Sequence, residues 1–121
     1  MAIIEAIETL YLEADATSVA FTSMAGYKHL QIRYSGASDT TGSNWQSINL
    51  QFNDDTGSNY TYRQLYSFSS SAAVFGSNAA NTRSGYITTY ETDGWAPQSY
   101  GAGVITIPDY LHANKNTVCM T

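Results

Sequence analysis

One short segment, Asn53–Gly57, gathers side chains that could bind a cation. Asp54 and Asp55 supply carboxylates, and Asn59 follows closely in the chain. Oxygen ligands of this kind suit Ca²⁺, but the spacing is not that of an EF-hand loop and no Glu follows at the required position. Asp and Asn also accept turn geometry, and Gly57 can supply a positive φ. We therefore interpret the segment as a tight turn, with Asp54 and Asp55 only a weak calcium candidate.

The titratable residues show no pattern typical of an enzyme. His29 and His112 are the two histidines, and neither is accompanied by a Gly-x-Ser-x-Gly turn. A Ser-His-Asp triad assembles in space, so spacing alone leaves it open, but the alternation around His29 favours a solvent-facing side chain. Glu91 and Asp93 could be the acid and base of a glycosidase, yet their positions do not give the separation that this chemistry needs. We predict that the protein is not an enzyme and binds no cofactor.

The aromatic residues are the better candidates for function. The chain has ten tyrosines and two tryptophans, many of them in or beside expected loops. Exposed Tyr and Trp anchor protein interfaces because they bury a large area at low entropic cost, and they also stack on sugar rings. We assign about half of the loop aromatics to the core instead. The predicted interface residues are Trp45, Tyr60, Tyr62, Tyr66, Trp95 and Tyr100.

Composition limits the classes of partner. The 121 residues fit one domain, 1–121. Lys and Arg total only five and the net charge is −5, which disfavours binding to nucleic acid. No apolar stretch approaches the roughly 20 residues of a membrane helix, and the first residues do not resemble a signal peptide. Cys119 is the single cysteine, so we expect a buried thiol, no intrachain disulfide, and a protein made in the cytoplasm without binding to membranes.

The elements that would position these residues are expected to be strands. The clearest is 28–35, which places Leu30, Ile32 and Tyr34 on one face and polar residues on the other. Over 59–66, helical spacing of apolar residues makes one short helix an alternative to a strand. We expect loops over 36–44 and 76–84. The other predicted strands are 1–12, 17–22, 47–52, 72–75, 85–90, 103–107 and 116–121.

About eight short strands separated by turn residues, without βαβ alternation, predict an all-β fold. We expect an antiparallel β-sandwich or a jelly-roll-like form. A chain that ends on a strand pattern is unusual, so the last strand is expected either to pair with a neighbouring molecule or to precede further strands.

Five phrases of the sequence, taken in order, carry a resemblance. They are Glu5–Leu10 followed by Glu13–Phe21, then Tyr27–Arg33, Leu50–Tyr60, and Ile107–Tyr110 with Asn114–Asn116. In order and spacing they resemble a family of small structural proteins of tailed bacteriophages, many from marine and cyanobacterial hosts. Members of that family usually continue with further Gly- and Ser-rich strands containing a Trp, so the resemblance implies a C-terminal truncation relative to the family.

The resemblance implies a component of the virion with no catalytic residues. We predict a capsid decoration or cement protein that binds the lattice of the major capsid protein, or other virion proteins, and forms a homo-oligomer. The alternative is a carbohydrate-binding module of a tail fibre or tailspike, with Trp45 and Trp95 as stacking platforms. A polysaccharide hydrolase is a third and weaker hypothesis, because no acid pair or nucleophile motif stands out.

Overall fold

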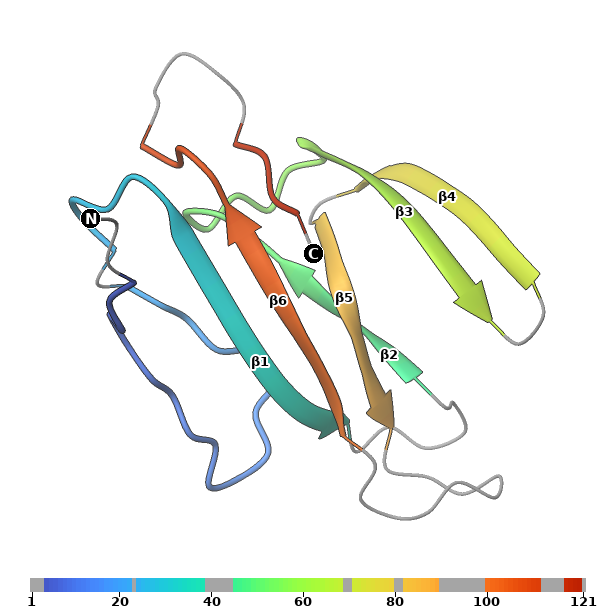
Figure 1. Cartoon of the computed structure of the whole chain (residues 1–121), viewed down its shortest axis with the longest axis horizontal. Helices are drawn as coiled ribbons and strands as arrows, with labels where there is room; N and C mark the ends of the chain where they lie inside the picture. Colours follow the sequence, from blue (N-terminus) through green and yellow to red (C-terminus); the bar gives the residue numbers. More distant parts are fainter. Residues whose placement is uncertain are drawn as a thin grey trace.

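The structure is a computed structural model that describes residues 4–22, 24–38, 45–68, 71–79, 82–89, 100–111 and 117–120. The described part of the chain is all-β. Its strands are β1 (Leu30–Ser38), β2 (Trp45–Leu50), β3 (Tyr60–Phe68), β4 (Ser71–Ala79), β5 (Thr82–Thr89) and β6 (Gly101–Ile107), as shown in Figure 1. Within these ranges no helix has the length and hydropathy of a membrane span.

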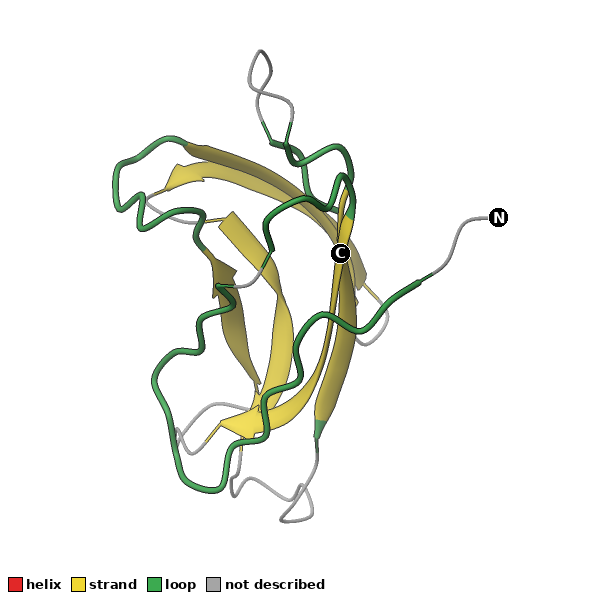
Figure 2. Ribbon diagram, turned by 90° about the vertical axis from the view of Figure 1, so that its left-hand side faces the viewer, coloured by secondary structure: helices red, strands yellow, loops and turns green. Residues whose placement is uncertain are grey.

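Four of the strands form one sheet in the order β2-β5-β1-β6. β1 and β6 are antiparallel along nearly their whole length, and so are β2 and β5. Within the described residues, the two pairs are joined where Ala37 and Ser38 run parallel to Thr88 and Thr89. Seen from the side, the strands are strongly curved (Figure 2). The sheet is therefore mixed at this single junction, although most of its ladders are antiparallel as predicted.

The remaining strands, β3 and β4, form a separate antiparallel hairpin. Tyr60 lies opposite Ala79 and Phe68 lies opposite Ser71, so the ladder covers both strands completely. The helical alternative over 59–66 is therefore wrong. Aromatic and β-branched residues in this segment suit a pleated strand, and the partner strand supplies the backbone hydrogen bonds that a helix would otherwise provide.

A small apolar core lies on one face of the β1–β6 pair. Leu30, Ile105 and Ile107 are its buried members among the residues whose side chains the structure describes. Alternation explains the pattern, since Leu30 lies opposite Ile107 and Ile32 lies opposite Ile105 on the same face of the ladder. The predicted face of 28–35 is confirmed. Partly buried residues that surround this core are Ile7, Met24, Tyr27, Ile32, Tyr34, Leu50, Phe52, Tyr110 and Cys119.

Several predicted boundaries are wrong. Residues 4–12 and 17–22 show strand-like alternation but form no strand, because they have no ladder partner in the described chain. The predicted loop 76–84 is largely strand, since β4 continues to Ala79 and β5 begins at Thr82. At the C-terminus, 117–120 contributes only an isolated bridge between Met120 and Thr106. Six strands in the described ranges therefore replace the eight expected; the loop residues 39–44 lie outside these ranges.

Candidate functional site

The acidic cluster after β2 is a hydrogen-bonded turn. Asp55 Oδ1 accepts hydrogen bonds from the Gly57 amide (2.9 Å) and from Asn59 Nδ2 (3.0 Å), and Oδ2 accepts a second contact from Asn59 (2.9 Å). The Asn59 side chain, followed by the Gly57 amide, lowers the pKa of the Asp55 carboxyl. Both oxygens of the Asp55 carboxylate thus accept hydrogen bonds within the turn.

Backbone geometry in the same turn differs from the expectation for Gly57. The positive φ values fall on Asn53 (52°) and Asp54 (57°), two residue types that tolerate this region. Gly57 is needed for space instead, because a Cβ there would lie 2.6 Å from Asn59 Nδ2. Among the described residues no three His, Cys, Asp or Glu side chains gather as metal ligands would. The predicted turn is therefore present, closed by the hydrogen bond from the Asp55 amide to the Phe52 carbonyl (3.0 Å).

Tyr60, one of the predicted interface residues, holds this turn against the next strand. Its hydroxyl accepts a hydrogen bond from the Phe52 amide (3.0 Å) and donates to the Asp55 carbonyl (3.2 Å). The two rings are stacked, with centroids 6.4 Å apart and an interplanar angle of 23°. A partly buried ring with a satisfied hydroxyl stabilises the chain's own loop, so Tyr60 has an internal role whether or not it also meets a partner.

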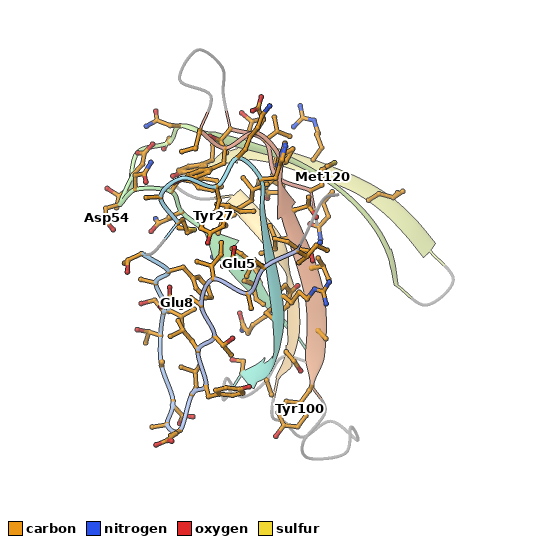
Figure 3. All side chains as sticks on the ribbon, turned by 60° about the vertical axis from the view of Figure 1, so that its left-hand side comes forward. Glu5, Glu8, Tyr27, Asp54, Tyr100 and Met120 are labelled. Atoms are coloured by element: carbon orange, nitrogen blue, oxygen red, sulfur yellow. The ribbon has the colours of Figure 1, made fainter. Side chains whose placement is uncertain are left out.

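The other predicted aromatics are distributed over the fold. Tyr100 is 66% exposed and immediately precedes β6. The backbone of Trp45 begins β2 opposite Thr88, at the same end of the sheet as Tyr100, while Asp54 lies at the opposite end (Figures 1 and 3). Tyr62 is partly buried on β3, Tyr66 lies opposite Ala73 in the hairpin, and Trp95 is outside the described residues.

His29 takes part in closing the end of the β1–β6 pair. Its Nδ1 accepts a hydrogen bond from the Asp109 amide (2.9 Å), and the Tyr110 amide donates to the Lys28 carbonyl (2.8 Å). The exposed Lys28 ammonium and the partly buried Asp109 carboxylate form an ion pair at 3.8 Å. His29 is exposed, as predicted, and its bonded partner is a backbone amide. His112, Glu91 and Asp93 lie outside the described residues.

The surface that sequence reasoning missed is the N-terminal segment 4–22. It runs beside β1 on the side away from β6 (Figure 1), and Figure 3 places Glu5 and Glu8 on it. Leu10, Tyr11 and Leu12 are consecutive apolar residues, so a strand with one buried face would leave at least one of them exposed; this was the available signal in the sequence. The segment's large apolar side chains that are exposed are Ile4, Leu10, Tyr11, Leu12 and Val19.

Comparison of the chain with protein families, curated proteins and solved structures finds no match. Its function has to be inferred from the surfaces described above.

Proposed function

We propose that this chain is a structural protein of a tailed-bacteriophage virion, and specifically a capsid decoration or cement protein that binds the lattice of the major capsid protein. The phage resemblance of five ordered phrases supports the virion assignment. The low content of charged residues, 12%, suits a dense and static contact in which few ions need desolvation.

The observation that carries the proposal is the mismatch between core and surface. Among the residues whose side chains the structure describes, the buried apolar residues are Leu30, Ile105 and Ile107, whereas Tyr11 and Leu65 are 87% and 77% exposed. A protein that works alone in solution gains little from such exposure, because each large apolar side chain is stabilised by about 1.5–3 kcal/mol when it is buried. Contact with a larger assembly would bury this surface.

Such a protein would strengthen a shell by mass action. A component that binds the assembled lattice more tightly than free subunits shifts the equilibrium towards the assembled state. No catalytic group is required, and the stabilisation grows with the occupied fraction of lattice sites.

We also propose the sandwich form for the fold. The β1–β6 and β2–β5 pairs would be its two layers, because in the part of the chain that the structure describes they pair with each other just at Ala37–Ser38 and Thr88–Thr89. The core side chains Leu30, Ile105 and Ile107 would lie between these layers.

The experiment that tests the virion role is a copy-number measurement. Quantitative mass spectrometry of purified particles would give the ratio of this protein to the major capsid protein. A ratio corresponding to a site on every capsomer supports decoration, and absence from washed particles would overturn the virion role. Re-binding of purified protein to particles that lack it, followed by a thermal shell-disruption assay, tests whether it acts as cement.

A carbohydrate-binding module of a tail fibre or tailspike is the second candidate. The observation in its favour is that exposed Tyr100 and the start of β2 at Trp45 share one end of the sheet. Aromatic rings at one end of a β-domain form stacking platforms for sugar rings.

A glycan array with the purified protein tests this second candidate. Tyr100→Ala and Trp45→Ala should each weaken binding, and Tyr11→Ala, on the N-terminal segment, should leave it unchanged. Trp95→Ala extends the test to the other predicted tryptophan. If no glycan binds, or if the variants at 45, 95 and 100 bind like the unaltered protein, the carbohydrate-binding role is rejected. A low copy number per particle together with glycan binding would favour it over decoration.

A further inference from the structure

We propose that His29 is an acid-sensitive switch for the corner Pro108–Tyr110, which follows β6. The neutral imidazole holds this corner against the start of β1, and protonation of the imidazole releases it. The switch is a property of the isolated chain, so it goes beyond the proposed virion role and does not depend on it.

The corner contains one residue more than the β1–β6 ladder can pair. The ladder ends at Leu30 and Ile107, and its register would place Lys28 opposite Asp109. The Lys28 carbonyl instead accepts a hydrogen bond from the Tyr110 amide (2.8 Å). Asp109 is therefore the extra residue of a bulge, and its φ of 54° lies in the left-handed region that Asp tolerates.

The imidazole of His29 supplies an acceptor for the amide of this extra residue. His29 would lie opposite Pro108 in the ladder, and a proline has no amide hydrogen to donate. The Asp109 amide, one residue further on, donates to His29 Nδ1 at 2.9 Å. A ring nitrogen that accepts a hydrogen bond carries no proton. The closed corner therefore requires the neutral imidazole with its proton on Nε2.

Protonation of the ring removes this contact. Both nitrogens of an imidazolium are donors, so a protonated Nδ1 would face the N–H of Asp109. His29 is exposed, and its charged ring can therefore turn into water without a desolvation cost. The Asp109 amide then loses this acceptor, and the left-handed backbone loses one of the contacts that hold it.

Two charged groups lie beside the contact and do not restore it. The Lys28 ammonium and the Asp109 carboxylate form an ion pair at 3.8 Å. The ammonium opposes a second positive charge next to it, whereas the carboxylate attracts one. An imidazolium could thus turn into water or compete with Lys28 for the carboxylate. In either arrangement Nδ1 no longer accepts from the Asp109 amide.

The pH range separates this imidazole from the other titratable groups nearby. Imidazole side chains change charge between about pH 5 and pH 8. Carboxyl groups ordinarily titrate near about pH 4, and phenols and thiols above about pH 8. A change confined to the range between them therefore identifies a histidine. The other titratable residues on segments that pack around this end of the core are Glu5, Glu8, Tyr27, Asp54, Asp55, Tyr110 and Cys119.

Release of the corner acts on the end of the apolar core. Leu30 and Ile107, the last pair of the ladder, are buried and directly adjoin His29 and Pro108 in the chain. Tyr110 packs against the same core. When the corner opens, water reaches this last pair first. Acid therefore loosens one end of the β1–β6 pair, while the remaining ladder stays formed.

The test is solvent exchange of the Asp109 amide in the purified chain, measured by NMR between about pH 5 and pH 8 and expressed as a protection factor. The protection factor should fall about fivefold towards the acidic end, the effect of losing one hydrogen bond. The nitrogen chemical shifts of His29 should show the Nε2–H tautomer at the basic end.

Two variants at position 29 separate the acceptor from its titration. His29→Asn should retain the protection of the Asp109 amide at every pH, because the Asn side-chain oxygen can replace Nδ1 as an acceptor and gains no proton in this range. His29→Ala has no acceptor and should show the low protection factor at every pH. Circular dichroism would verify that each variant retains its strands.

Two further variants are controls for other charges. His112→Asn removes the other histidine of the chain and should leave the pH dependence unchanged. Asp109→Asn keeps the backbone amide and a residue type that tolerates a positive φ, but it removes the carboxylate. The pH dependence should also remain in this variant, because the contact is made to the amide.

Four results would overturn the proposal. They are a protection factor that does not change with pH, a pH dependence that persists in His29→Asn, and its loss in either His112→Asn or Asp109→Asn. The virion role is tested separately on purified particles. A corner that opens in acid in a protein absent from particles would support the switch and reject the virion role, so the two proposals fail independently.

Discussion

The ring of Tyr34 lies over Gly103, its antiparallel partner on β6. A Cβ at position 103 would lie 2.8 Å from Tyr34 Cε1 and would also contact the Tyr34 hydroxyl. Burial of the ring raises the pKa of the Tyr34 phenol. An aromatic ring that covers a glycine in the neighbouring strand protects backbone that would otherwise be left open, and it extends the core beyond Ile105.

Gly103→Ala should therefore destabilise the protein by about 1–2 kcal/mol, because the new methyl group forces the Tyr34 ring out of its buried position. Urea denaturation followed by tyrosine fluorescence would measure the change. Gly36→Ala is the matched control: Gly36 lies on the same face of β1 and a Cβ there meets nothing within 4 Å. It should be neutral or stabilising by about 0.5 kcal/mol. Equal losses in both variants would contradict the steric explanation.

Removal of one hydroxyl should show that Tyr60 holds the turn after β2. Tyr60→Phe keeps the ring stacked on Phe52 but deprives the Phe52 amide of its acceptor. We expect a loss of about 1 kcal/mol in the free energy of unfolding and faster amide exchange at Phe52. Tyr11→Phe, at a tyrosine that is 87% exposed, should change stability little. An unaltered exchange rate at Phe52 in Tyr60→Phe would argue against this role.

The fold is predicted best from the sequence where a strand of alternating polar and apolar residues, together with its partner strand, lies beside the apolar core. The faces of β1 and β6 follow from Leu30, Ile32 and Ile105, because a period of two is meaningful on a half-buried strand. The turn after β2 also follows from its Asp and Asn residues. In contrast, β4 continues through Gly76, where no apolar signal exists, because its backbone pairs with β3 from Ser71 to Ala79.

Non-local pairing explains most of the errors. Residues 59–66 contain both helical spacing and strand-forming residues, and only the nine-residue partner β4 decides between them. The strand prediction for 4–12 and 17–22 is wrong for the opposite reason. The pattern of these residues is that of a strand, but the described chain offers them no partner strand. Among the site residues, the internal hydrogen bonds of Tyr60 depend on the folded turn and have no sequence signature.

The Asp55 turn should weaken in acid. Because the folded-state pKa lies below the ordinary value of 3.8, the carboxylate's contribution to stability is present above that value and is lost as pH falls through the lower folded-state pKa. An NMR titration of the Asp55 carboxyl would measure the depression directly. In Asn59→Ala the pKa should rise towards 3.8, since Asn59 is the largest cause of the shift. If the Asp55 pKa in Asn59→Ala is as low as in the unaltered protein, a group other than Asn59 lowers it.

Cys119 should react slowly with thiol reagents. Burial raises its pKa above the ordinary value of 9.0, so a smaller fraction is thiolate at any pH below that value. Alkylation by iodoacetamide at about pH 8 should therefore be slower in the native protein than in urea. The reciprocal bonds between Met120 and Thr106, at 2.7 and 2.8 Å, hold the segment that carries the thiol. Met120→Pro removes one of the two hydrogen-bond donors, so alkylation of the native variant should be faster and approach the rate measured in urea. If the unaltered native protein already reacts at the rate measured in urea, the bridge does not protect Cys119.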